Sequence, residues 1–358
     1  MTAAATGALI APPVRPMLAR LARELPADGY LYEPKWDGFR CLAFRSGDDV
    51  DLRSRNDRPL ARYFPEIVEG LRALTESRFV LDGEIVVASP RGFDFATLLS
   101  RLHPARSRVE RLRIEAPATM IGFDLLALDE DLRYRPFSTR REGLSRLLGA
   151  GNAAVVATPI TDDVGVAAAW LERFHGGVAD GVVAKHRELR YVEGAREMVK
   201  VKRELTAECV VAGARLLADR PVLSSLLLGV YDDEARLQHV GLCTQFAEEE
   251  RRQLLLELEP LVVPLAGHPW ERGFLLEGSP IGRLKGAAAR WSPEEMELDW
   301  VPLNPTRVCE VGYDHLDRDR LRHPARFVRW RPDRDPLSCT FDQFGPPPVD
   351  AAALIGRR

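Results

Sequence analysis

The chain has 358 residues, of which 46% are hydrophobic and 29% charged, a balance typical of a globular rather than a disordered protein. Its net charge of −3 excludes nucleic-acid binding through overall positive charge, so any basic surface has to be local. The length favours two domains over one, and no apolar run approaches the roughly 20 residues that cross a bilayer.

The first part of the chain is predicted to combine strands and helices in an α+β pattern. Residues 30–55 favour a β-meander, and residues 64–74 a helix with Pro65 near its first turn. Apolar and amphipathic patterns predict further strands at 79–89, 118–129, 180–187 and 196–203, and helices at 95–102, 138–151 and 164–177.

The sequence changes character after Arg203, where short strands become dominant. Strands are expected at 207–217, within 224–244, at 307–313 and at 326–332, with one Glu/Arg/Leu-rich helix at 247–261. This set of elements is typical of an OB-fold, a small β-barrel. The sequence therefore predicts a domain at 1–203, an OB-fold domain at 204–335 and a C-terminal tail at 336–358.

The five cysteines are far apart and form no C-x-x-C pair: they are Cys41, Cys209, Cys243, Cys309 and Cys339. This spacing favours reduced thiols over a disulfide framework or a zinc site. The N-terminal residues lack the basic and long apolar regions of a signal peptide. We therefore expect a cytoplasmic protein without membrane contact.

Lysine is rare in this chain, and its positions are informative. Of the 50 basic residues, 45 are arginines, and the lysines are Lys35, Lys185, Lys200, Lys202 and Lys285. Lysine can act as a nucleophile once its amine is neutral, whereas arginine stays protonated. Lys35, in the stretch YEPKWDGFR, is the candidate for a position that requires an amine.

Charged residues recur at alternate positions in several predicted strands, and alternate positions share one face. These pairs are Glu33 with Lys35, Arg53 with Arg55, Asp82 with Glu84, and Lys200 with Lys202. Any one pair also fits a half-buried strand whose polar face meets water. Taken together, they predict a charged cleft lined by several strands.

Such a cleft would suit nucleophilic chemistry on a phosphate. The cations Lys200 and Lys202 would disfavour protonation of Lys35 and would bind phosphate. Glu84 and Asp180 would hold a hard divalent cation. Phe123 would stack on a base, although it also fits a core aromatic residue, and Lys185 also fits a charge at the end of a strand.

Six short motifs occur in the order seen in the covalent nucleotidyltransferases, and the chain resembles the ATP-dependent DNA ligases among them. In chain order they are KWDGFR, RSRN, LDGEIV, FDLL, DGVVAK and MVKVKR. The resemblance implies that 1–203 is a nucleotidyltransferase (adenylation) domain with antiparallel sheets. It spans about residues 15–335 and is strongest for the small bacterial ligase C type.

The resemblance implies a role for each motif residue. Lys35 would form a lysyl-AMP, while Glu33 and Arg40 would hold adenine and ribose. Arg55 would contact the sugar and the nick phosphate, and Phe123 would stack on adenine. The remaining assignments are Glu84 to the ribose hydroxyl and the metal, Asp180 to the metal in place of the more usual Glu, Lys185 to the nucleotide, and Lys200 and Lys202 to the α-phosphate.

The stretch RWRPDR resembles the last ligase motif, R-x-D-K, through Arg331, Asp333 and Arg334, with Arg in place of the final Lys. We expect the OB-fold domain to close over ATP so that Arg331 and Arg334 orient the departing pyrophosphate. The implied cofactors are ATP and Mg²⁺ or Mn²⁺. The implied activity is sealing of 3′-OH/5′-phosphate nicks in duplex DNA by a monomer in the bacterial cytosol, in DNA repair.

Other functions remain open from the sequence. The same motifs serve RNA ligases and GTP-using capping enzymes, because stacking on Phe123 tolerates any base. A nucleic-acid-binding protein without catalysis is a third alternative, which the set Lys35, Glu84, Lys200 and Lys202 disfavours. RNA-containing nicks also stay open as substrates, and the sequence assigns no role to Lys285.

Overall fold

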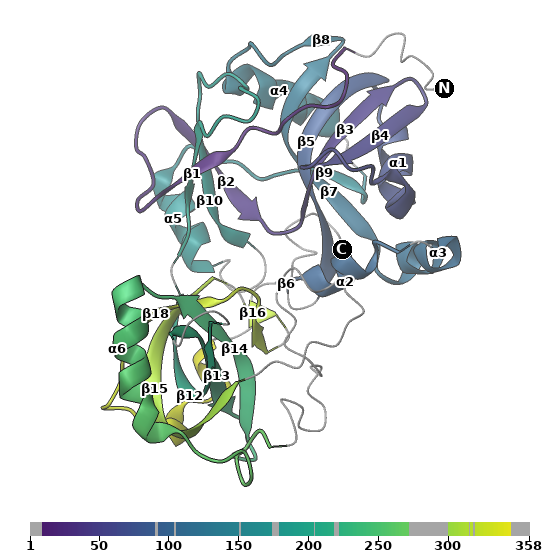
Figure 1. The fold of residues 1–358 in the computed structure, drawn as a ribbon. Coiled ribbons are helices and arrows are strands. Elements are labelled where there is room, and N and C mark those ends of the chain that lie inside the picture. The colour runs from purple at the N-terminus through teal and green to yellow at the C-terminus, as the bar shows by residue number, and fades with distance from the viewer. Residues whose placement is uncertain are drawn as a thin grey trace. The chain divides into compact units, whose positions relative to one another are not determined.

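The computed structural model describes residues 9–89, 92–103, 105–149, 152–173, 179–203, 205–217, 222–271, 300–314, 316–317 and 319–344. The chain divides after Arg203 into two compact units (Figure 1). No helix among these described residues is both long and apolar enough to cross a membrane. Lys285 and the last residues of the chain, 345–358, lie outside the described residues.

The larger sheet of the first unit carries most of that unit's hydrophobic core. Its strands run in the order β4-β3-β5-β7-β8, with β6 paired to β5 and β9 paired to β7. Leu81 and Ile85 of β5 point into this core, where helices α1 (Pro65–Arg72) and α4 (Phe137–Leu148) cover them. The strands are β3 (Phe39–Ser46), β4 (Asp49–Ser54), β5 (Arg78–Ser89), β6 (Gly92–Phe93), β7 (Ala118–Leu128), β8 (Glu130–Asp131) and β9 (Val155–Ala157).

A smaller sheet in the same unit has the strand order β1-β11-β10-β2. β1 is parallel to β11, and the other pairs in this sheet are antiparallel. The strands are β1 (Ala19–Ala22), β2 (Tyr30–Trp36), β10 (Ala179–His186) and β11 (Met198–Val201). The sheet thus joins segments from both ends of the unit's sequence.

The prediction of one meander over residues 30–55 is wrong. β3 and β4 form the expected hairpin, but β2 pairs with β10 in the other sheet. Pro34 has no N–H for a ladder and lies in β2, an edge strand, which is where sheets tolerate proline. Gly38 follows the strand so close to β5 that a Cβ would stand 2.1 Å from the carbonyl oxygen of Ile85. Glycine therefore permits the crossing from one sheet to the other.

The helices of the first unit follow the predicted segments, with one addition. Pro65 begins α1, and the Asp94 side chain caps α2 by accepting a hydrogen bond from the Thr97 N–H at 2.8 Å. The sequence analysis missed α3, whose charged surface leaves only Val109 buried. The helices are α1 (Pro65–Arg72), α2 (Phe95–Ser100), α3 (Arg106–Glu115), α4 (Phe137–Leu148) and α5 (Val164–Arg173), with a 3-10 turn η1 (Ala61–Tyr63).

The second unit is a closed barrel of five strands in the order β12-β13-β14-β18-β15, which confirms the predicted OB-like barrel. Helix α6 (Glu248–Leu258) packs against it through Leu254 and Leu258, and η2 (Glu259–Leu261) follows the helix. The barrel strands are β12 (Leu205–Leu216), β13 (Leu223–Tyr231), β14 (Leu237–Gln245), β15 (Val301–Tyr313) and β18 (Ala325–Trp330).

Residues 336–344, which the sequence analysis assigned to a tail, pack on this barrel. Two 3-10 turns, η4 (Pro336–Ser338) and η5 (Phe341–Phe344), flank the buried Cys339, whose carbonyl accepts a hydrogen bond from the Tyr231 N–H at 2.7 Å. A small hairpin, β16 (Leu316–Asp317) and β17 (Arg320–Leu321), completes the unit. All five cysteines are free and buried.

Candidate active site

A cavity of about 240 Å³ in the first unit is lined by residues of both sheets. β2, β10 and β11 contribute from the smaller sheet, whereas β3, β5 and β7 contribute from the larger one. The predicted site residues that line it are Glu33, Lys35, Arg40, Arg55, Glu84, Phe123, Lys185 and Lys200. The fold therefore brings these residues into one cleft from many places in the sequence.

Lys35 lies in this cavity and makes an ion pair that the sequence analysis did not predict. Its Nζ is 2.8 Å from Oδ2 of Asp180, and the same oxygen is 3.2 Å from Nζ of Lys202. Burial opposes ionisation of Asp180, but Lys35 and Lys202 outweigh it and hold the pKa of Asp180 below its ordinary value. Asp180 therefore stays ionised and forms ion pairs with two of the five lysines, Lys35 and Lys202.

Lys200 is the third lysine of this group and lines the cavity itself. Its pKa is lowered first by burial and then by the charges of Lys35 and Lys202. Arg196 adds a further positive charge beside it. The expected crowding of cations is present, and an anionic ligand such as a phosphate would relieve it.

Glu84 lies on β5, on the opposite side of the sheet from Leu81 and Ile85, as strand periodicity predicted. Its Oε1 accepts a hydrogen bond from the Gly38 N–H at 3.1 Å. Burial raises the pKa of Glu84 to about 7, although the charges of Arg40 and Lys35 oppose the rise. A half-buried carboxyl group with a raised pKa would be stabilised in its ionised form by a further cation bound beside it.

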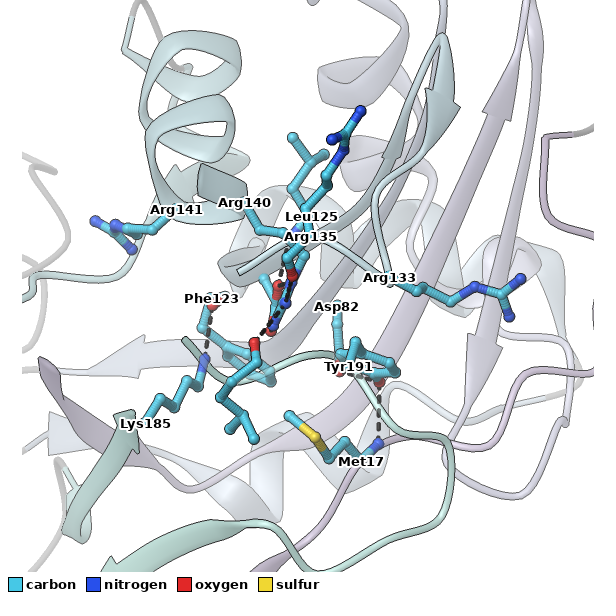
Figure 2. Close-up of polar contacts among 12 residues, drawn as sticks. Met17, Asp82, Phe123, Leu125, Arg133, Arg135, Arg140, Arg141, Lys185 and Tyr191 are labelled. Atoms are coloured by element: carbon cyan, nitrogen blue, oxygen red, sulfur yellow. Dashed lines mark hydrogen bonds and ion pairs between the residues drawn. The ribbon is translucent and has the colours of Figure 1, made fainter. Parts of the chain in front are cut away.

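Arg40 is held in the cavity by Asp82, which is completely buried. Two hydrogen bonds join the guanidinium to this carboxylate, at 2.9 and 2.6 Å. The Tyr191 hydroxyl donates to Asp82 at 2.7 Å and accepts from the Met17 N–H at 3.0 Å (Figure 2). The Arg40 guanidinium then lies 5.1 Å from the centre of the Phe123 ring, which fixes both side chains at the cavity wall.

Lys185 is a buried part of the site and not a charge at the end of a strand. Its Nζ donates to the Phe123 carbonyl at 2.7 Å, as Figure 2 shows, and is 2.8 Å from Oε2 of Glu33. Lys185 is 1% exposed and Glu33 is 2% exposed. Phe123 and Glu33, which both line the cavity, are thus joined through Lys185.

Some cavity residues were not found from the sequence. Arg196, just before β11, lines the cavity, as do Leu18 and Met198. Within the described part of the chain, Arg55, Arg196 and Lys200 are cavity cations for which no ion pair is recorded. Arg196 begins the predicted strand 196–203 and shares its alternate positions with Lys200 and Lys202, so strand periodicity was a signal that the sequence analysis did not use.

Arg331, Asp333 and Arg334 lie in the second unit, just after β18. The Arg331 Nη2 is 2.8 Å from the Asp333 carboxylate, and Arg331 also pairs with Glu208. Arg334 lies 2.5 Å from Glu208 through its Nε. The two arginines are therefore joined through one glutamate of β12 within their own unit.

The described residues contain no group of three or more His, Cys, Asp or Glu side chains that could hold a metal ion by themselves. Glu84 lines the cavity, and Asp180 is reached through Lys35. Two carboxylates of this kind fit Mg²⁺, which commonly uses one or two protein carboxylates together with phosphate oxygens and water.

Together, the fold and the site define a nucleotidyltransferase of the ligase type. The model of the "ATP dependent DNA ligase domain" matches residues 11–202, and that of the "ATP dependent DNA ligase C terminal region" matches residues 219–334. The chain belongs to the ATP-dependent DNA ligase family. This finding confirms the expected fold class, ATP use and ligase activity.

More particularly, the chain is similar to bacterial ligases of the C type. DNA ligase C of Mycobacterium tuberculosis is 46% identical, with 94% of this chain and 95% of that protein covered. DNA ligase C2 of Mycolicibacterium smegmatis is also 46% identical, with 97% and 99% covered. A solved Lig E DNA ligase shares the fold at 18% identity and a TM-score of 0.54, with 88% of this chain and 99% of that chain covered. These matches favour a DNA ligase over the RNA-ligase, capping and non-catalytic alternatives.

Proposed function

We propose that this ligase seals 3′-OH/5′-phosphate nicks in duplex DNA through AMP bound covalently to Lys35. One observation supports the proposal: Lys35 lines the cavity together with the aromatic residue Phe123 and with cations from both sheets. Phe123 offers a face for the base, and Lys200 and Arg196 offer charges for the phosphates. The group thus matches each part of a nucleoside triphosphate.

In the first step, the Lys35 amine attacks the α-phosphorus of ATP. A P–N bond forms, the bond to the bridging oxygen breaks, and pyrophosphate leaves. The amine loses a proton in the process, and its contact with Asp180 offers an acceptor 2.8 Å away. Lys200 and Lys202 offset the charge that develops on the phosphate oxygens.

Glu84 and Asp180 would hold Mg²⁺ or Mn²⁺ once phosphate oxygens complete the coordination. A bound divalent cation would supply charge neutralisation at the α-phosphate. Asp180 has one methylene fewer than the usual Glu, and in this chain it is already oriented by Lys35 and Lys202. Binding of the cation by Asp180 would compete with these two ion pairs and so loosen the hold on the Lys35 amine.

Arg331, Asp333 and Arg334 would act from the OB unit during the first step only. In-line displacement needs positive charge beside the leaving pyrophosphate, and the two arginines would supply it on closure of that unit. Asp333 orients Arg331 by accepting two hydrogen bonds, from the Arg331 Nε at 2.9 Å and from the Arg331 Nη2 at 2.8 Å. The unit would then reopen before DNA binds.

In the second step, AMP passes from Lys35 to the 5′-phosphate at the nick, forming a P–O–P linkage to the DNA. In the third step, the 3′-hydroxyl attacks that 5′-phosphate and AMP leaves. Arg55 lines the cavity without a recorded ion pair among the described residues, and it would contact the nick phosphate. We assign the activity to DNA repair by a monomer in the bacterial cytosol, where the five free thiols would stay reduced.

The proposal is tested with labelled ATP and a nicked DNA duplex. Lys35→Ala should give no protein–AMP adduct and no sealing from ATP, whereas Lys285→Ala, the matched lysine control, should give both. An adduct of normal yield in Lys35→Ala would remove this lysine from its role. A second duplex with a ribonucleotide at the 3′ side of the nick determines whether DNA or RNA ends are preferred.

A further inference from the structure

Glu33 is a buried carboxylate, and one of its two oxygens accepts no hydrogen bond from the described residues. It is 2% exposed and lines the cavity, and its Oε2 pairs with Lys185 at 2.8 Å. Its Oε1 has no hydrogen-bond partner in the part of the chain that the structure describes. Because buried carboxylate oxygens are rarely left unpaired, Oε1 is an acceptor prepared for a donor on the ligand.

Arg141 approaches the same oxygen from the protein side. It leaves α4 in a direction different from its neighbour Arg140 (Figure 2). Its Nη1 is 3.6 Å from Oε1 of Glu33, an ion-pair distance, while its Nη2 donates to the Thr158 carbonyl at 2.7 Å. Its side chain is only 11% exposed and is not part of the cavity wall. Arg141 therefore acts on a ligand only through Glu33.

The charges that face Glu33 decide whether its carboxyl group is ionised. Burial raises the pKa of Glu33, the nearby charge of Asp124 on β7 adds to the rise, and Lys185 and Arg141 oppose it. Lys185 is shared, because it also donates to the Phe123 carbonyl. Arg141 is therefore the cation whose contact with Glu33 serves no other part of the cavity.

Ionisation of Glu33 matters for the base that stacks on Phe123. Adenine carries an exocyclic amine at C6, a donor, whereas hypoxanthine and guanine carry a carbonyl there, an acceptor. A carboxylate only accepts, so that it binds the amine and repels the carbonyl. A protonated carboxyl group also donates, and it would then tolerate the carbonyl.

We propose that Arg141 is a positioning residue for base selection: it keeps Oε1 of Glu33 a charged acceptor and so favours adenine over six-oxo purines. This inference rests on the proposed function, because it places the base of ATP at Phe123 and Glu33. It gives α4, which contributes no residue to the cavity lining, an indirect role in nucleotide selectivity through Glu33.

The test compares ATP with inosine triphosphate in formation of the protein–AMP or protein–IMP adduct, between pH 5.5 and 8.5. Arg141→Met removes the charge and keeps a similar length. It should narrow the preference for ATP over inosine triphosphate by about tenfold, because the loss of the Arg141 charge favours the protonated form of Glu33, which also accepts a six-oxo base. As the pH is lowered, the rate of adduct formation from ATP should begin to fall at a higher pH in Arg141→Met than in the wild type, because Glu33 is protonated more easily without the Arg141 charge. Arg146→Met, an exposed change on the same helix, should match the wild type.

A second variant separates charge from packing, since Arg141→Met can impair folding. Arg141→Lys keeps the charge, and it should retain both the ATP preference and the wild-type pH profile. Loss of the preference in Arg141→Lys would overturn the inference, as would an unchanged preference and pH profile in soluble Arg141→Met. Absence of any adduct in the wild type would instead contradict the proposed function, so that the two failures are distinguishable.

Discussion

Burial of Glu84 has a cost for the folded protein at the residue scale. Its pKa of about 7 lies above the ordinary value of 4.5, so the unfolded chain ionises first as the pH rises. Stability linked to Glu84 is present below about pH 4.5 and is lost as the pH passes through 7. Ionisation of Glu84 thus destabilises the folded protein at neutral pH, although the proposed reaction requires the ionised form.

Glu84→Gln should therefore stabilise the metal-free protein at pH 8 by about 2–3 kcal/mol, and the gain should shrink towards pH 5. Urea unfolding with a chelator present, at both pH values, measures the difference. The same variant should lose self-adenylation. A variant less stable than the wild type at pH 8 would show that Glu84 contributes favourable contacts in its ionised form.

Arg196 is a cavity cation without a role from any motif. Its charge lies close enough to Lys200 to lower the pKa of that lysine, and an arginine bound to phosphate makes strong charged hydrogen bonds. Arg196→Ala should raise the ATP concentration for half-maximal adduct formation about tenfold. The exposed Arg190→Ala is the control, and equal ATP requirements in the two variants would remove Arg196 from the triphosphate site.

Sequence reasoning worked best for residues whose chemistry is unusual for this chain. Lys35 stood out because arginine replaces lysine almost everywhere, and Glu84 because strand periodicity gave its face. The contact of Lys35 with Asp180 could not be predicted, since it joins β2 to β10 across a long stretch of sequence. Arg141 was missed for the same reason, because its helix gives no sign of which strand it meets.

At the scale of elements, a buried ion pair fixes α4 to β7. Arg140 donates to Asp124 through Nε and Nη2, at 2.7 and 3.0 Å, and both side chains are at most 1% exposed. The remaining donor Nη1 binds the carbonyls of Arg135 and Leu189 at 2.7 and 2.8 Å. The pair therefore sets the place of α4, and with it the approach of Arg141 to Glu33.

Asp124→Ala should destabilise the first unit by about 3–5 kcal/mol, because it leaves the Arg140 charge buried without its partner. Glu69→Ala, which breaks the surface pair with Arg113, should cost under about 1 kcal/mol. Chemical unfolding of both variants at one pH gives the comparison. Similar losses in the two would mean that the buried pair does not anchor α4.

Elements with strong periodicity or clear ends were predicted well, and their pairing was predicted less well. The barrel strands and α6 alternate or repeat in the expected way, whereas α3 has one buried residue and gave no signal. The meander failed because strands close in sequence were assumed to pair. Gly38, whose missing Cβ permits the passage past β5, was visible in the sequence only as a turn residue.

At the scale of the whole molecule, the account requires Arg331 and Arg334 of the barrel unit to act in self-adenylation and not in the later steps. Arg331→Ala should slow self-adenylation more than tenfold, the loss expected for one charged contact to the leaving group. It should affect sealing of a pre-adenylated nick much less. Arg329→Ala, an exposed change on β18 two residues before Arg331, is the control. Equal losses in both assays would contradict a role limited to the first step.

The central claim is that one lysine of the cavity, Lys35, carries the nucleotide. The most direct measurement is mass spectrometry of the protein after incubation with ATP and Mg²⁺, followed by peptide mapping of the added AMP. The account predicts one AMP per chain, on the peptide that contains Lys35. AMP mapped to Lys200 or Lys202, or an ATP-treated protein that seals nicks without ever carrying AMP, would contradict it.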